Sequence, residues 1–259
     1  MAQLYLSNLG LSHFRSHRRA VIDVDARPVA LYGPNGAGKT NIIEAISLLS
    51  PGRGLRRTSA QDMARRPEAL GWKVTGLLHG PTVLHEVDIW SEAGAARQTK
   101  IDGKASAQTA LGRIARVLWL IPAMDRLWIE GAEGRRRFLD RVTLSMLPDH
   151  ADLSLSYEKA MREPAWYTAL ETRMAETGAQ IHANRLQALA ALEAAQAEAQ
   201  TAFPIATLSL LNDMPESADA LRAALSDNRM RDLAAGRTLI GPHRADLEST
   251  YAAKGIAAR

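Results

Sequence analysis

Cysteine is absent from this sequence of 259 residues. That absence excludes disulfide bonds, thiol catalysis and cysteine-ligated zinc, and it suits the reducing conditions of the cytosol. Long apolar runs are also missing, and none approaches the roughly 20 residues that a membrane-spanning helix needs. Residues 1–10 lack the basic and then apolar form of a signal peptide. We therefore expect a cytoplasmic protein with no membrane partner.

The composition otherwise indicates a globular chain whose charge is unevenly distributed. Hydrophobic residues make up 46%, which supports a core in one large domain or two smaller ones. Residues 1–141 hold 21 Lys/Arg and 13 Asp/Glu, a balance of +8, and the remainder holds 11 and 15, a balance of −4. A basic first part favours a polyanionic partner, but ordinary surface charge explains so modest an excess equally well.

The stretch that organises the chain is a phosphate loop. Residues 33–40 read GPNGAGKT and match the pattern G-x-x-x-x-G-K-[ST] without a mismatch. The β-prone run Pro28–Tyr32 precedes the loop, and a helical pattern follows with apolar residues on one predicted face: Ile42, Ile43, Ile46 and Leu49. This strand, loop and helix order is the context that the motif requires.

The chemistry of such a loop assigns a role to each part of it. Its glycines let several backbone N–H groups converge on one anion, and the following helix adds its positive dipole end. Lys39 is expected to reach the β- and γ-phosphates of a nucleotide, and the Thr40 hydroxyl is expected to ligate Mg²⁺. The predicted cofactors are therefore ATP and Mg²⁺, held by Gly33, Pro34, Asn35, Gly36, Ala37, Gly38, Lys39 and Thr40.

Two strands are predicted before the loop, and a basic loop follows its helix. Leu4–Leu11 and Val21–Val24 have strand patterns and are joined by a basic turn at 13–19. A basic segment at 51–59 contains Arg56 and Arg57, which cannot pack into a core. These arginines are either solvated or bound to phosphate.

A further antiparallel sheet is predicted between residues 72 and 104. Segments 73–78 and 83–89 form a predicted hairpin, and 98–104 adds a strand and a turn. His79 and His85 have no partner at metal-ligand spacing, so both are predicted to be structural or surface residues.

The apolar run at 117–121, followed by Asp125, has the general form of a Walker B strand. We reject this assignment because Walker B places its acidic pair directly after the run, whereas Pro122-Ala123-Met124 intervenes here.

The second part of the chain is predicted to be mostly helical. Ala165–Ala202 and Ala218–Ala235 carry leucines and other apolar residues at helical spacing, which predicts a helical hairpin or short coiled coil. Phe203-Pro204 is expected to end the first helix, and Pro164 to interrupt the helix before it.

Several strings along the chain resemble one family. The turn LSHFRS (11–16) and the strings RRRFLDR (135–141), SYEKAMRE (156–163) and RTLIGPHRADL (237–247) resemble the RecF family, within the chromosome-maintenance and repair branch of the ABC-type ATPases. The likeness runs from end to end of the chain. It implies an α/β ABC-type ATPase head, with a central sheet and an antiparallel sheet and with an inserted helical or short coiled-coil lobe.

The resemblance also implies a function. RecF-like proteins bind ATP, single-stranded DNA and linear double-stranded DNA, and act in recombinational repair, replication-fork maintenance and the SOS response. They form ATP-dependent homodimers and act with RecO- and RecR-type partners. By resemblance, Arg56 and Arg57 become candidates for contacts with ATP or DNA phosphates. The implied domains are a head at 1–143, a helical arm at 144–236 and a return into the head at 237–259.

The sequence departs from the family pattern after this return. The family continues with a Ser-x-Gly-Glu-Gln-type signature, a Walker B strand and a switch histidine, and this sequence stops at Arg259 before them. We therefore expect ATP binding to be retained better than hydrolysis, ATP-driven dimerisation to be weak, and the phosphate-loop strand to have an open apolar edge.

Two other functions remain open from the residues alone. A phosphate-loop kinase for a small metabolite would use the cluster Arg135-Arg136-Arg137 as a phosphate clamp. A non-catalytic remnant would bind DNA by charge alone, with a steep salt dependence that ATP does not change.

Overall fold

The computed structural model describes residues 4–68, 70–93, 95–163, 168–251 and 256–258. The chain separates into two compact units, residues 1–119 and 120–259, and each is described by itself.

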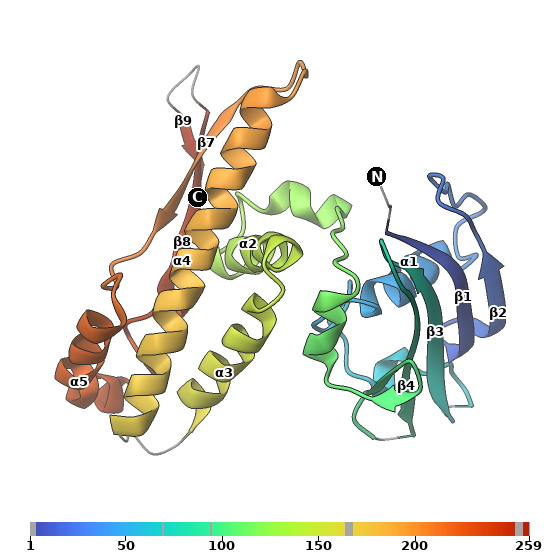
Figure 1. The fold of residues 1–259 in the computed structure, drawn as a ribbon, viewed down its shortest axis with the longest axis horizontal. Coiled ribbons are helices and arrows are strands. Elements are labelled where there is room, and N and C mark those ends of the chain that lie inside the picture. The colour runs from blue at the N-terminus through green and yellow to red at the C-terminus, as the bar shows by residue number, and fades with distance from the viewer. Residues whose placement is uncertain (1–3, 69, 94, 164–167, 252–255, 259) are drawn as a thin grey trace. The chain divides into compact units, whose positions relative to one another are not determined.

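The first unit is built on a six-stranded antiparallel sheet in the order β2-β1-β3-β4-β5-β6 (Figure 1). Its strands are β1 (Tyr5–Phe14), β2 (His17–Asp23), β3 (Gly71–His79), β4 (Leu84–Glu92), β5 (Gln98–Ile101) and β6 (Lys104–Ala105). The two strands expected before the phosphate loop and the hairpins expected after it are confirmed. Because all neighbours are antiparallel, short turns suffice to connect most of them.

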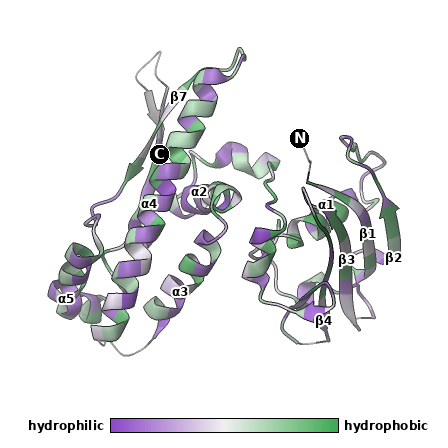
Figure 2. Cartoon of the chain, in the orientation of Figure 1, coloured by the Kyte–Doolittle hydropathy of each residue, from purple (hydrophilic) through white to green (hydrophobic). Residues whose placement is uncertain are grey.

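The core of this unit lies where helix α1 (Lys39–Leu48) covers the sheet. Leu9, Phe14, Val74 and Ile89 come from the strands and are buried against Leu48 and other apolar residues. Both hydrophobic and hydrophilic colouring appear along the strands of this unit in Figure 2. The packing positions the start of α1, and with it the end of the phosphate loop.

Two sequence predictions fail beside this core. Pro28–Tyr32 is not a strand, and Val29 and Tyr32 are 55% and 94% exposed. A strand needs a neighbour to pair its backbone groups, and no described strand pairs with this run. The predicted apolar face of α1 is also wrong in part, because Ile43 is exposed while Glu44 and Ala45 are buried.

Short 3-10 turns connect other parts of the chain: η1 (Gln61–Met63), η2 (Gln108–Arg113) and η3 (Pro122–Arg126). Asp125 lies in η3, and the apolar run at 117–121 before it is not a strand. This geometry agrees with the rejection of a Walker B assignment there.

The second unit packs three helices against one long helix. Helices α2 (Ala132–Met146), α3 (His150–Arg162) and α5 (Ala218–Ala235) all contact α4 (Thr168–Glu198). A three-stranded antiparallel sheet follows the order β7-β8-β9, with strands β7 (Ala206–Leu211), β8 (Asp246–Tyr251) and β9 (Ile256–Ala258), and η4 (Pro242–Arg244) precedes β8. Hydrophilic and hydrophobic colouring alternates along α4 (Figure 2).

The helices of this unit largely follow the sequence prediction. The bounds of α5 are confirmed, and Ser217 caps the helix by accepting a hydrogen bond from the Ala220 N–H. The two helices predicted to pack together do so, α4 against α5, and strand β7, which lies between them in the chain, pairs with β8. The predicted break at Pro164 lies outside the described residues.

Candidate phosphate-loop site

The loop before α1 has the backbone that its glycines predict. Gly33, Gly36 and Gly38 have φ values of 147°, 85° and 90°, in the region that favours glycine. A Cβ at Gly38 would lie 2.6 Å from His17 Nε2, so both its dihedral angle and the available space require glycine there. The loop therefore turns sharply into the helix.

The start of α1 is open to an anion. The helix has no side-chain cap and no acidic residue in its first turn. Its first N–H groups therefore carry partial positive charge without a competing carboxylate. Lys39 Nζ donates to the carbonyls of Gly33 (2.7 Å) and Pro34 (2.8 Å), so the ammonium group lies within the loop. Thr40 is exposed on the first turn.

The turn between β1 and β2 supports the end of the loop. His17 Nε2 lies 3.3 Å from the Gly38 carbonyl, and the Asn41 amide donates to Ser16 Oγ at 2.8 Å. Arg65 holds the same turn through the Ser16 carbonyl. The basic turn at 13–19 is therefore a structural support of the phosphate loop.

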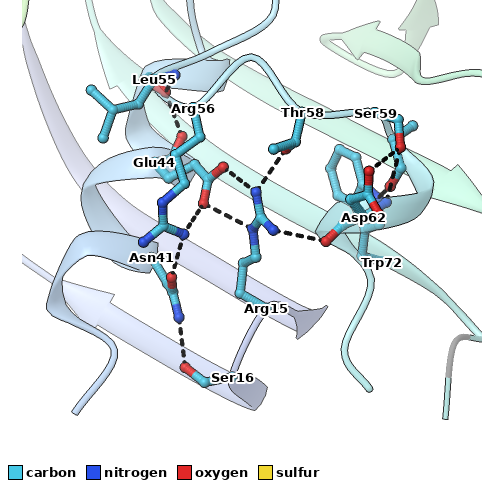
Figure 3. A network of polar contacts seen from close by, with 12 residues as sticks. Arg15, Ser16, Asn41, Glu44, Leu55, Arg56, Thr58, Ser59, Asp62 and Trp72 are labelled. Atoms are coloured by element: carbon cyan, nitrogen blue, oxygen red, sulfur yellow. Dashed lines mark hydrogen bonds and ion pairs between the residues drawn. The ribbon is translucent and has the colours of Figure 1, made fainter. Parts of the chain in front are cut away.

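A polar network of this unit surrounds Glu44 (Figure 3). The Glu44 side chain is fully buried, at 0% exposed. Arg15 donates to both of its oxygens, from Nε at 2.9 Å and from Nη2 at 2.6 Å. Arg56 Nη1 adds a third contact at 2.8 Å. Two arginines thus share one carboxylate on α1.

The two arginines predicted to contact phosphate differ in their environments. Arg56 donates from Nη1 to Asn41 Oδ1 (2.8 Å) as well as to Glu44, and its side chain is 38% exposed. Arg57 is exposed, with a φ of 55°. These hydrogen bonds bring Arg56 against the first turns of α1.

Four residues of this site were not predicted from the sequence: Arg15, Ser16, Asn41 and Glu44. A signal was available, because Glu44 is the only acidic residue in a helix whose neighbours are mainly apolar. A buried carboxylate requires a cation, and the basic segments at 13–19 and 51–59 were the candidate sources.

An apolar groove of about 500 Å³ lies beside α1. Its lining includes Leu6, Val29, Leu31, Ile42, Ile43 and Ile46. The groove explains why the predicted apolar face of α1 is only partly buried. The open apolar strand edge expected at the loop is not found, because Pro28–Tyr32 is not a strand, although Val29 and Tyr32 are exposed there.

The arginine cluster that a kinase would use as a clamp has other partners in this structure. Arg135 pairs with Asp246 and is 4% exposed, Arg136 donates to the Ala245 carbonyl, and Arg137 pairs with Glu133. Burial lowers the pKa of Arg136, and the Asp246 carboxylate raises that of Arg135. The cluster is therefore structural, and the kinase hypothesis loses its clamp.

In the described part of the chain, no group of three His, Asp or Glu residues is placed to hold a metal ion. No described helix has both the length and the apolar character to cross a membrane. His79 stacks on Tyr5, with ring centroids 4.4 Å apart, and His85 contacts Asp102, so both have structural partners.

Comparison with known proteins agrees with this geometry. A family model described as an AAA domain matches residues 8–89. Two solved structures of the recombination mediator protein RecF, with ATP and with an ATP analogue, superpose with TM-scores of 0.80 at 21% and 20% identity. They cover 96% and 95% of this chain and 73% of the RecF chains. The chain thus has the fold of an ABC-type ATPase head, with a phosphate loop before α1.

Curated relatives identify the family. The chain is 41% identical to the DNA replication and repair protein RecF of Mesorhizobium japonicum, over 99% of this chain and 75% of the relative. Identity to RecF of Caulobacter vibrioides is 40%, over 95% of this chain and 73% of the relative. This chain belongs to the RecF family of DNA replication and repair proteins.

Proposed function

We propose that this chain binds ATP with Mg²⁺ at the phosphate loop. The observation that carries the proposal is the uncapped start of α1 beside a glycine loop with Lys39 inside it. Lys39 would exchange the two loop carbonyls for phosphate oxygens, and Thr40 would ligate the ion. The ATP-bound RecF structures, which share this fold, support the same ligand.

We further propose that the chain acts on DNA in replication and recombinational repair. The family name of its relatives supports this role. The proposal includes binding to single-stranded and linear double-stranded DNA, RecO- and RecR-type partners and an ATP-dependent homodimer. It also includes a cytoplasmic site of action and a part in the SOS response. Within the basic first part of the chain, the exposed Arg57 is the better candidate for a DNA phosphate. The division into a head at 1–143, an arm at 144–236 and a return at 237–259 is also proposed.

Nucleotide binding is tested by calorimetric titration with ATP and Mg²⁺. Lys39→Ala should reduce the affinity strongly, whereas Lys104→Ala, which removes an exposed lysine from β6, should leave it unchanged. If Lys39→Ala bound ATP as tightly as the natural chain does, the assignment of the phosphate loop would be wrong.

DNA binding is tested by fluorescence anisotropy with labelled single-stranded and linear double-stranded DNA, with and without ATP. We expect the chain to bind DNA more tightly with ATP than without it. In Arg57→Ala, the affinity for DNA should fall, and the slope of log affinity against log salt concentration should be lowered by about 1. Affinity that ATP leaves unchanged at every salt concentration would instead favour binding by charge alone.

A further inference from the structure

The second unit contains a cavity of about 280 Å³ at the end of β7. One wall comes from residues 211–214, where β7 ends, and the other comes from residues 239–246, which lead into β8. The volume is close to the roughly 300 Å³ at which pockets for small ligands begin. The cavity is therefore large enough for one side chain or a group of similar size.

Three helices hold the backbone of the second wall in place. The contacts are Arg136 Nη1 of α2 to the Ala245 carbonyl (2.8 Å), Arg185 Nη1 of α4 to the Pro242 carbonyl (2.7 Å) and the Leu239 N–H to Asp232 Oδ1 of α5 (3.0 Å). Arg185 and Asp232 are buried, at 4% and 0% exposed. The wall is thus fixed before any ligand binds, and a preorganised site loses less free energy on binding.

Two hydrogen-bond donors at this cavity have no partner among the described residues. Arg244 is exposed, and its guanidinium group takes part in none of the hydrogen bonds and ion pairs of the described chain. Asn212 Oδ1 accepts from the Met214 N–H at 3.2 Å, which sets the orientation of the amide. Asn212 Nδ2 is then buried without a partner in the part that the structure describes. A buried N–H group without an acceptor is costly, so these donors favour a ligand with acceptor atoms.

The charges near the cavity favour a carboxylate over a chain of phosphates. Asp246 forms a two-point pair with Arg135, so it leaves the charge of Arg244 available. Asp213 is exposed at the same cavity, and residues 142–259 hold 11 Lys/Arg and 15 Asp/Glu, a balance of −4. Acidic surroundings repel a chain of phosphates, whereas a guanidinium group can bind a single carboxylate at two points.

Apolar side chains complete the lining of the cavity. Met214 is buried, and Leu211, Leu239 and Ile240 are half-buried. A ligand with an apolar group next to its carboxylate would bury that group against these side chains. Peptides have this combination where an acidic residue, or the C-terminus of a chain, adjoins an apolar residue.

We propose that this cavity binds the carboxylate of a peptide segment of a partner protein, next to an apolar residue of that segment. Arg244 and Asn212 Nδ2 donate to the carboxylate, and Leu239 and Ile240 contact the apolar neighbour. The site is separate from the phosphate loop and goes beyond the nucleotide and DNA roles proposed above.

The proposal is tested by NMR of the full chain, labelled at the methyl groups of methionine and isoleucine. Acetyl-Gly-Ser-Leu-Asp-Gly-Ser-amide offers a side-chain carboxylate, and acetyl-Gly-Ser-Gly-Ser-Leu with a free C-terminus offers a terminal one. At least one of them should shift the signals of Met214 and Ile240 and leave that of Met230, which is 76% exposed on α5, in place. The peptide that does so identifies the source of the carboxylate.

The neutral peptide acetyl-Gly-Ser-Leu-Asn-Gly-Ser-amide is the matched control for charge. It should bind at least tenfold more weakly than the Asp peptide where the side-chain carboxylate is the ligand, through loss of about one charge-assisted hydrogen bond. The proposal is overturned if neither carboxylate peptide shifts the two signals, or if the neutral peptide shifts them at the same concentrations as both carboxylate peptides.

Two variants test the donors. Arg244→Gln removes the charge of an exposed residue and should weaken binding of the carboxylate peptide by about tenfold. Arg222→Gln, which removes an exposed arginine from α5, should leave the affinity unchanged. Asn212→Asp retains an acceptor for the Met214 N–H but replaces the buried donor with a carboxylate, so it should also weaken binding. Thermal unfolding shows whether each variant is folded, and an unchanged affinity in Arg244→Gln would contradict the proposal by itself.

A DNA phosphate is the competing ligand for the same donors. Short oligothymidylate, titrated in the same NMR experiment, should shift the signals of Met214 and Ile240 less than the carboxylate peptide does. If oligothymidylate shifted both signals and the peptides shifted neither, the cavity would be a DNA contact and the peptide site would be wrong.

Discussion

Arg135 and Asp246 are 111 residues apart in the chain and form a two-point ion pair, with Arg135 Nε to Asp246 Oδ1 at 2.7 Å and Nη2 to Oδ2 at 2.9 Å. The pair joins the start of α2 to the start of β8. Arg135 also donates to the carbonyls of Leu127 and Glu130, so its hydrogen-bonding groups are well occupied. The segments 135–141 and 237–247, which both resemble the RecF family in sequence, are thus joined by one side-chain pair.

Arg135→Ala should destabilise the second unit. It removes the buried partner of Asp246 and leaves that carboxylate without its cation, which costs about 3 kcal/mol of unfolding free energy. Urea denaturation followed by circular dichroism measures the change. Arg137→Ala, which breaks an exposed pair on the same helix, should cost about 0.5 kcal/mol or less. Equal costs for the two variants would contradict the role of Arg135.

Acid should weaken the second unit through Asp140. Burial raises the pKa of this carboxyl, but the hydrogen bond from His150 and the charge of Arg185 outweigh burial and lower it from 3.8 to about 2. A lowered pKa stabilises the fold at pH values above 3.8, and this contribution is lost as the pH falls from 3.8 towards 2.

The size of the acid effect is limited by solvent. The Asp140 side chain is 34% exposed, so water screens the charges, and we expect a loss of about 1–2 kcal/mol of unfolding free energy over that range. Urea unfolding at a series of pH values measures it. Asp140→Asn should be less stable at neutral pH, and its free energy of unfolding should change less with pH in acid than that of the natural chain. If the free energy of unfolding changed as steeply in the variant, other groups would be the cause of the acid effect.

Gly38→Ala should be more damaging than Gly36→Ala. Both glycines have positive φ values, 90° and 85°, so each alanine costs about 1 kcal/mol or more in backbone strain. A Cβ at Gly38 would also collide with His17 and Ser16, whereas a Cβ at Gly36 would meet nothing within 4 Å. Thermal unfolding compares the two variants without nucleotide. The prediction fails if Gly36→Ala is the less stable of the two.

The elements that the sequence predicted correctly have local causes. Helix α5 has its capping serine at Ser217 and a glycine at Gly236 with a φ of 62°, so both of its ends are set by neighbouring residues. The strands β3 and β4 alternate in burial, and in β4 the apolar Val87 and Ile89 are buried on either side of the less buried Asp88. The phosphate loop was found because its function requires a fixed short pattern.

The elements that the sequence did not predict depend on distant partners. Pro28–Tyr32 has the composition of a strand, but composition cannot provide the pairing strand. Glu44 can be buried because two arginines neutralise it. Arg15 precedes α1 in the chain and Arg56 follows it, at separations of 29 and 12 residues from Glu44. Strand β7 forms only because β8 returns to pair with it. Such pairings are properties of the whole fold.

The exposed apolar surface beside the loop should cause self-association of this chain. Val29 is 55% exposed and Tyr32 is 94% exposed, next to an apolar groove of about 500 Å³. Contiguous apolar surface of this kind favours contact with other molecules. Replacing both residues with lysine should therefore lower the apparent mass at high protein concentration, measured by light scattering after gel filtration. Because neither side chain is buried, the melting temperature should change little. As a control, lysine at the exposed Leu155 of α3, in the second unit, should leave the mass unchanged. An unchanged mass in the Val29 and Tyr32 variant would show that this surface does not drive association.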